Sequence, residues 1–170
     1  GIGLNSYKGV APGSRLLIAK VFGAADSTSS ATIVSALDWC ADNGAEVINM
    51  SLGHGGYSSA CDTEYTALFA NNTAALGIVV VAASGNDGYT DKISSPACGA
   101  KVLSVGSVSK ADARSSFSNG ASILNVMAPG EYITTTNKNG SFSTFSGTSA
   151  ATPFVTGVAA LLKSLPEDPS

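Results

Sequence analysis

The chain has 170 residues, of which 44% are hydrophobic and only 12% are charged, and its formal net charge is −3. This length and composition favour one domain with a sizeable core. The 9 basic residues are scattered and the apolar runs are far shorter than the roughly 18 residues of a membrane span, which excludes a nucleic-acid-binding or membrane-spanning protein.

Strand-like and helix-like segments alternate from the start of the chain. Residues 16–22 form an apolar run rich in strand formers, followed by a Ser/Thr-rich turn. Ile33, Leu37 and Cys40 then recur at helical spacing, and Gly44 follows as the glycine that ends the helix. These segments predict a strand followed by a helix.

The same rhythm continues through the middle of the chain. A second helix pattern runs from Tyr65 to Leu76 and ends at Gly77. The predicted strands of this region are 47–52, 78–83, 102–108 and 123–128. Strands that are apolar on both faces and alternate with helices predict an α/β fold with a mostly parallel central sheet covered by helices.

The last part of the chain predicts a hairpin that leads into a helix. Residues 132–145 carry Asn137 to Gly140 between two stretches rich in Thr and Phe, which is typical of a β-hairpin. Pro153 cannot donate a hydrogen bond to the carbonyl of Ser149, so the helix must begin at or just before Ser149.

Ser149 is the most informative residue of this region. It stands among small residues where a glycine turn enters the helix, so unpaired backbone N–H groups and the positive end of the helix dipole lie beside its hydroxyl. Such a setting suits a nucleophile that attacks a carbonyl group. The alternative is an ordinary Ser/Thr-rich loop that caps a buried helix.

The segment 147–162 resembles the nucleophile segment of the subtilisin-like serine proteases, the subtilases. Further blocks of that family appear in the family's order along nearly the whole chain. They lie at residues 9–12, 47–53, 79–86, 95–97, 117–120 and 127–130. The resemblance implies a subtilisin-like three-layer fold and a serine endopeptidase that acts on polypeptides through an acyl-enzyme on Ser149.

The family's catalytic triad runs Asp, His, Ser along the chain, and only the serine is matched here. The aspartate strand and the histidine helix would both precede residues 9–12, and His54 follows Ser51 to Gly53 and so does not occupy the catalytic position. We therefore expect residues 1–170 to be one partial catalytic domain, incomplete at the N-terminus and inactive alone.

The resemblance assigns further residues to the site. Asn86 matches the family's oxyanion-hole asparagine, although a turn residue would also fit its Gly-rich loop. The matched substrate-binding walls are Ser51, Leu52 and Gly53 on one side and Ala83, Ser84 and Gly85 on the other. These small residues predict an open primary pocket for medium or large apolar side chains, with His54 at its rim or exposed in a loop.

Two other functions compete with the peptidase. A catalytically dead, subtilase-like module could keep the peptide cleft and bind without cleaving. An α/β-hydrolase esterase is disfavoured, because Ser149 lies in Gly-Thr-Ser-Ala-Ala and not in Gly-x-Ser-x-Gly. The sequence upstream of Gly1 would separate the first two functions.

The cysteines and two acidic residues give expectations about thiols, bridges and metals. Cys40 is expected to be a buried thiol, while Cys61 and Cys98 fit either a disulfide bridge or two free thiols. Asp87 and Asp91 share a loop but lack the alternating oxygen ligands of an EF-hand, so no metal or other cofactor is assigned and a structural calcium site stays open. From the resemblance we expect an extracellular protein that is monomeric when complete.

Overall fold

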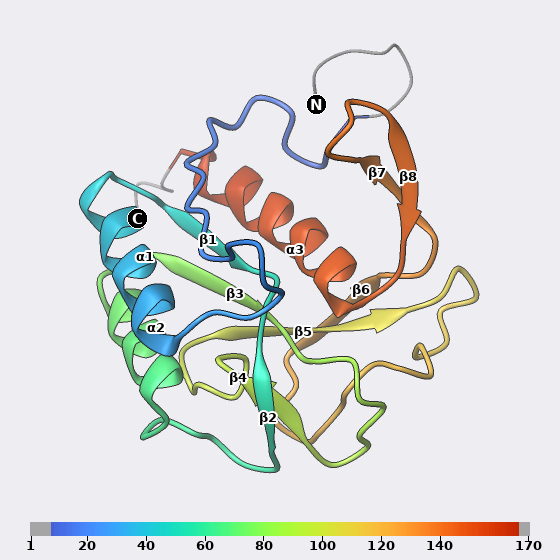
Figure 1. The fold of residues 1–170 in the computed structure, drawn as a ribbon, viewed down its shortest axis with the longest axis horizontal. Helices are drawn as coiled ribbons and strands as arrows, with labels where there is room; N and C mark the ends of the chain where they lie inside the picture. The colour runs from blue at the N-terminus through green and yellow to red at the C-terminus, as the bar shows by residue number, and fades with distance from the viewer. Residues whose placement is uncertain (1–7, 167–170) are drawn as a thin grey trace.

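A computed structural model of the chain describes residues 8–166 (Figure 1). Its helices are α1 (Ser30–Asp42), α2 (Tyr65–Ala75) and α3 (Thr148–Lys163). Its strands are β1 (Val47–Met50), β2 (His54–Tyr57), β3 (Val79–Ala83), β4 (Ile93–Ser95), β5 (Leu103–Val108), β6 (Val126–Pro129), β7 (Ile133–Thr136) and β8 (Phe142–Phe145).

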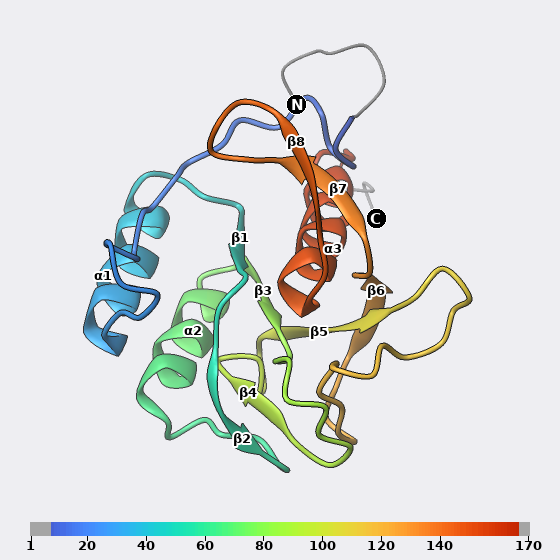
Figure 2. The ribbon, with the colours of Figure 1, turned by 45° about the vertical axis from the view of Figure 1, so that its right-hand side comes forward.

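A parallel sheet in the order β1-β3-β5-β6 forms the centre of the fold. Helices α1 and α2 cover one face and α3 covers the other (Figure 2). Alternation along β3 explains these layers, because Val80 and Ala82 pack with the first two helices while Val81 packs with Ala151 of α3. The predicted three-layer α/β architecture is confirmed.

The ends of the first two helices follow the predicted glycines. Gly44 and Gly77 have φ angles of 76° and 88°, in the left-handed region that favours glycine. The N-caps are Ser29, whose hydroxyl accepts from the N–H of Thr32, and Glu64, whose carboxylate accepts from the N–H of Ala67. These caps fix where α1 and α2 begin.

Two small antiparallel pairs lie outside the main sheet. The hairpin of β7 and β8 was predicted, and it turns at Asn137 to Gly140 before the chain enters α3. The pair of β2 and β4 was not predicted, because His54 to Tyr57 contains two glycines and few strand formers. This pair forms one border of the cleft described below.

The strand predicted at residues 16–22 is wrong for the described structure, which has no regular secondary structure there. A strand needs a neighbour for its hydrogen bonds, and β1 is hydrogen-bonded only to β3 among the described strands. Leu16 and Ile18 are each 74% exposed. Residues 9–21, α1, β1 and α3 border a groove of about 1060 Å³ beside the free edge of β1.

Candidate active site

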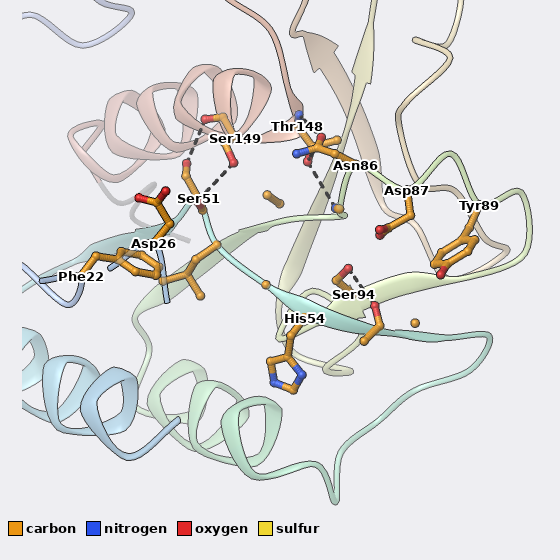
Figure 3. A pocket seen from close by; sticks show the side chains of 16 residues that line it. Phe22, Asp26, Ser51, His54, Asn86, Asp87, Tyr89, Ser94, Thr148 and Ser149 are labelled. Atoms are coloured by element: carbon orange, nitrogen blue, oxygen red, sulfur yellow. Dashed lines mark hydrogen bonds between the residues drawn. The ribbon is translucent and has the colours of Figure 1, made fainter. Parts of the chain in front are cut away.

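An open cleft of about 560 Å³ lies where the chain leaves β1 and β3 and enters α3 (Figure 3). The carboxyl ends of parallel strands meet at the same edge of a sheet, which is where α/β proteins commonly bind ligands. The cleft is lined by Phe22, Asp26, Ser51, Leu52, Gly53, His54, Gly55, Gly56, Ala83, Gly85, Asn86, Asp87, Tyr89, Ser94, Thr148 and Ser149.

Ser149 is the second residue of α3 and is partly buried. Its hydroxyl donates a hydrogen bond to the carbonyl of Ser51 at 3.2 Å. The hydroxyl of Ser51 donates to the carbonyl of Ser149 at 3.0 Å. This carbonyl is available because Pro153, four residues later, has no N–H to donate to it. The helix therefore tolerates the proline by exchanging a helical bond for a bond to Ser51.

Asn86 lies beside the start of α3, and its orientation is set by Thr148. Its side-chain oxygen accepts hydrogen bonds from the N–H of Thr148 at 2.8 Å and from the Thr148 hydroxyl at 3.0 Å. The Asn86 amide nitrogen and the N–H of Ser149 have no acceptor among residues 8–166. Two donors beside one serine hydroxyl are what an oxyanion requires.

Glycine is needed at two places in the walls of the cleft. Gly85 has a φ angle of 104°, and a Cβ there would collide with Asn119 and Ser94. A Cβ at Gly53 would lie 2.8 Å from the carbonyl oxygen of Ser95, which is backbone and cannot move aside cheaply. Both walls therefore present backbone directly to the cleft.

The structure brings together most of the residues that the sequence assigned to the site. Ser51, Leu52, Gly53, Ala83, Gly85, Asn86 and Ser149 all line the cleft. Ser84 does not line it, because its side chain is fully buried and donates to the carbonyl of Asn119 at 3.0 Å. Ser84 supports the wall from behind.

No described histidine or carboxylate is hydrogen-bonded to the hydroxyl of Ser149. His54 lies on the strand β2, not in a loop, and its side chain is 50% exposed at the rim of the cleft. Its Nε2 lies 3.4 Å from Oε1 of Glu64. The described residues therefore place a serine hydroxyl beside two donors without an acceptor, and no histidine or carboxylate is hydrogen-bonded to that hydroxyl.

Glu64 is held by several groups beneath His54. Burial would raise the pKa of Glu64, but hydrogen bonds from the Ser95 hydroxyl and from the N–H groups of Ala67 and Thr66, together with the charge of His54, lower it below its ordinary value. The carboxylate is thereby kept ionised at one end of α2.

Several residues of the cleft were not anticipated from the sequence. Phe22, Asp26, Tyr89, Ser94 and Thr148 line it, as does Asp87, which was considered from the sequence for calcium but not assigned to any site. One signal in the sequence could have identified Tyr89 and Asp87 as cleft residues, because both follow Asn86 closely in the same loop. Ser94 comes from β4, which the sequence did not predict.

The structure shows which cysteines are bonded and which is free. Cys61 and Cys98 form a disulfide bridge with a Cα separation of 5.4 Å, and Cys40 is a free, buried thiol. Burial raises the pKa of Cys40. Within residues 8–166 no group of three or more His, Cys, Asp or Glu side chains could hold a metal ion, and no helix is long and apolar enough to cross a membrane.

Comparison with known proteins gives consistent matches. The sequence profile of the subtilase family matches residues 2–169. The subtilisin of Bacillus pumilus is 40% identical over 159 residues, which are 92% of this chain and 56% of that protein. Subtilisin E of Bacillus subtilis is 39% identical over 159 residues, 92% of this chain and 40% of that protein. The chain thus spans about half the length of these curated relatives.

Solved structures give the same result. The patellamide maturation protease PatA superimposes with a TM-score of 0.84 at 32% identity, covering 95% of this chain and 60% of that one. A cold-adapted subtilisin-like serine proteinase superimposes with a TM-score of 0.75 at 34% identity, covering 85% of this chain and 52% of that one. Family and fold therefore agree.

Proposed function

Because the chain belongs to the subtilase family, we propose that it forms part of a serine endopeptidase in which Ser149 is the nucleophile. One observation carries this proposal. Two donors that have no acceptor, the Asn86 amide and the Ser149 N–H, lie beside the Ser149 hydroxyl. The cleft beside them has a volume of about 560 Å³ and is bordered by two segments that the resemblance assigns to the walls around an extended peptide.

In the proposed reaction, the hydroxyl oxygen of Ser149 attacks the carbonyl carbon of a peptide bond while a base removes its proton. The negative charge that develops on the carbonyl oxygen is stabilised by the two donors. Collapse of the tetrahedral intermediate breaks the C–N bond, and the amine leaves with the proton from the base. Water then hydrolyses the acyl-enzyme on Ser149 by the same steps.

We place the base and its orienting carboxylate outside residues 1–170. The described residues put neither group against Ser149, and the matched relatives are about twice as long as the matched segment. The groove beside the free edge of β1 has room for additional chain next to the cleft. The 170 residues alone are then expected to have no triad-dependent activity.

The test compares three proteins on a chromogenic peptide: the full-length protein, its Ser149→Ala variant and the 170-residue chain. Only the unmodified full-length protein should hydrolyse the peptide and react with a serine-directed sulfonyl fluoride. The variant Ser58→Ala, which changes an exposed serine, is the matched control and should keep full activity. Labelling that persists in Ser149→Ala would overturn the assignment of the nucleophile.

The second candidate is a peptide-binding module without catalysis. It is favoured by the bond from the Ser149 hydroxyl to the carbonyl of Ser51, which leaves the hydroxyl without a base. A full-length reading frame with an Asp-bearing strand and a His-bearing helix upstream of Gly1 would decide for the peptidase. Their absence, together with peptide binding but no hydrolysis, would decide for the module.

We also propose that the protein is extracellular and monomeric when complete. The Cys61–Cys98 bridge supports an extracellular location, because such bridges persist in oxidising compartments. Fractionation of the source cells and sedimentation of the full-length protein test these two proposals.

A further inference from the structure

We infer that the cleft selects a cationic side chain, lysine or arginine, at the substrate residue whose carbonyl Ser149 attacks. This inference rests on the proposed function and names the substrate class of the same site. The small residues of the walls predicted a preference for apolar side chains. That prediction took no account of the carboxylates that line the cleft.

The ionised groups that line the cleft are acidic. Asp26 and Asp87 are its carboxylates, and the described lining contains no lysine or arginine. His54 is its remaining titratable side chain besides Tyr89, and it is directed to Glu64 at 3.4 Å. Both carboxylates are exposed to solvent, so their attraction for a cation in the cleft is weakened by added salt.

Asp87 is the carboxylate placed to meet a side chain that enters between the two walls. Figure 3 shows it turned toward the middle of the cleft, across from Ser94 and on the same loop as Asn86. The walls on either side are Ser51 to Gly53 and Ala83 to Gly85. A substrate residue with its carbonyl at Ser149 and Asn86 would direct its side chain between them.

Asn119 holds the Asp87 carboxylate in this position. The Asn119 side chain is fully buried, donates to Oδ2 of Asp87 at 3.0 Å, and accepts from the N–H of Asp87 at 2.9 Å. It also accepts from the N–H of Tyr89 at 3.1 Å. A side chain that is already fixed loses little entropy when it binds a ligand.

The second oxygen of Asp87 is uncommitted. Across residues 8–166, Oδ1 accepts no hydrogen bond, and the one ion pair found there joins His54 to Glu64. Lys92 is placed over the ring of Tyr89, with its Nζ 5.7 Å from the ring centre, and does not pair with Asp87. A carboxylate oxygen without a partner, on a residue that lines the cleft, fits an ammonium or guanidinium group.

The rest of this region suits the long side chain that carries such a group. Ala83, Gly85 and Leu52 offer apolar surface and backbone to the methylene stem. Ser94 is buried, and its hydroxyl donates to the carbonyl of Gly55 at 3.1 Å, so its lone pairs can accept a hydrogen bond from the cation.

The test uses full-length protein and a set of chromogenic peptides that differ only at the residue before the cleaved bond: Lys, Arg, Leu, Phe or Glu. We expect kcat/KM to be highest for Lys and Arg. Asp87→Asn should lower kcat/KM for these two peptides by about 5-fold, the upper end for an exposed ion pair, and change it for Leu by less than about 2-fold. Added salt should reduce the preference.

Two further variants serve as controls. Asp91→Asn removes a carboxylate from the same loop outside the cleft and should leave the preference unchanged. Asp87→Glu restores the charge and should restore the preference, which separates loss of charge from damage to the fold. Equal kcat/KM for Lys and Leu, or an equal loss in Asp91→Asn and Asp87→Asn, would overturn the inference.

The result also separates this inference from the proposed function. Ser149-dependent hydrolysis without a cationic preference would refute the inference and leave the peptidase standing. If no peptide is hydrolysed, the proposed function fails, and binding of the same peptides by fluorescence anisotropy decides the inference. Tighter binding of the Lys peptide that is lost in Asp87→Asn supports it, and equal binding of the Lys and Leu peptides overturns it.

Discussion

Ser51 and Ser149 are hydrogen-bonded in both directions, each hydroxyl donating to the carbonyl of the other residue at 3.0 and 3.2 Å. The pair joins the end of β1 to the start of α3, across 98 residues of sequence. The amide of Asn49 adds a bond to the Ser51 hydroxyl at 2.9 Å. The nucleophile proposed here is thus held in place by the central sheet.

Ser51→Ala should lower the free energy of unfolding by about 1 kcal/mol, because one partly buried hydrogen bond is lost and the carbonyl of Ser149 is left without its donor. Urea denaturation measures this change. Ser58→Ala, at an exposed site, is the control and should change the free energy by less than about 0.5 kcal/mol. Equal effects in the two variants would show that the reciprocal pair contributes nothing.

Asn86→Ala should lower the turnover number of the full-length protein by roughly 100- to 1000-fold with little change in KM, the magnitude known for the oxyanion asparagine of subtilisin. The reason is that the amide donor acts mainly when charge develops on the oxyanion. Steady-state kinetics measure both constants. Asn72→Ala, at an exposed position of α2, is the control, and an unchanged turnover number in Asn86→Ala would remove this residue from the site.

Removal of the Cys61–Cys98 bridge should lower the free energy of unfolding by about 2 to 4 kcal/mol, because the bridge closes a loop with a sequence separation of 37. Urea denaturation of a Cys61→Ala, Cys98→Ala double variant measures the loss. A reducing agent should destabilise the original protein and leave the double variant unchanged. If the reducing agent affects both proteins equally, the loss does not come from this bridge.

The Glu64 network should make stability depend on pH in the acid range. The folded state lowers the pKa of Glu64 below its ordinary value of 4.5, so the stabilisation is present above pH 4.5 and is lost as the pH falls through the lower, folded-state value. Glu64→Gln should therefore be less stable than the original protein at neutral pH, and the difference should shrink on acidification.

Urea denaturation at pH 7 and at pH 3 measures this difference. Glu46→Gln changes the same type of side chain away from the network and is the matched control. A difference between the Glu64→Gln protein and the original that stays constant with pH would show that the carboxylate charge is not what stabilises this region.

The sequence predicted the parts of the fold that depend on local patterns. The helix at α1 followed from Ile33, Leu37 and Cys40, and its end followed from Gly44. The strand β3 followed from its continuous apolar run. Residues 16–22 show the limit of such patterns, because a strand-forming composition gives a strand only where the segment is hydrogen-bonded to a neighbour, and this segment is not paired with the free edge of β1.

The sequence likewise predicted only some residues of the candidate site. Ser149 and Asn86 were identified because each lies in a motif with a known family pattern. Asp26 and Ser94 could not be identified, because their place in the cleft depends on loops and on the short pair of β2 and β4. Asn119 lies in the matched block 117–120, but its role could not be inferred, because it arises from contacts with residues about 30 positions earlier.

Asn119 makes the loop from Ser84 to Tyr89 inseparable from a second segment of the chain. Its backbone N–H donates to the carbonyl of Gly85 at 3.0 Å, its carbonyl accepts from the Ser84 hydroxyl, and its side chain engages Asp87 and Tyr89. A transplant of this loop into another protein would keep the sequence of the loop but lose its shape unless the asparagine were transferred with it. In recombination or design experiments, the two segments must therefore be transferred together.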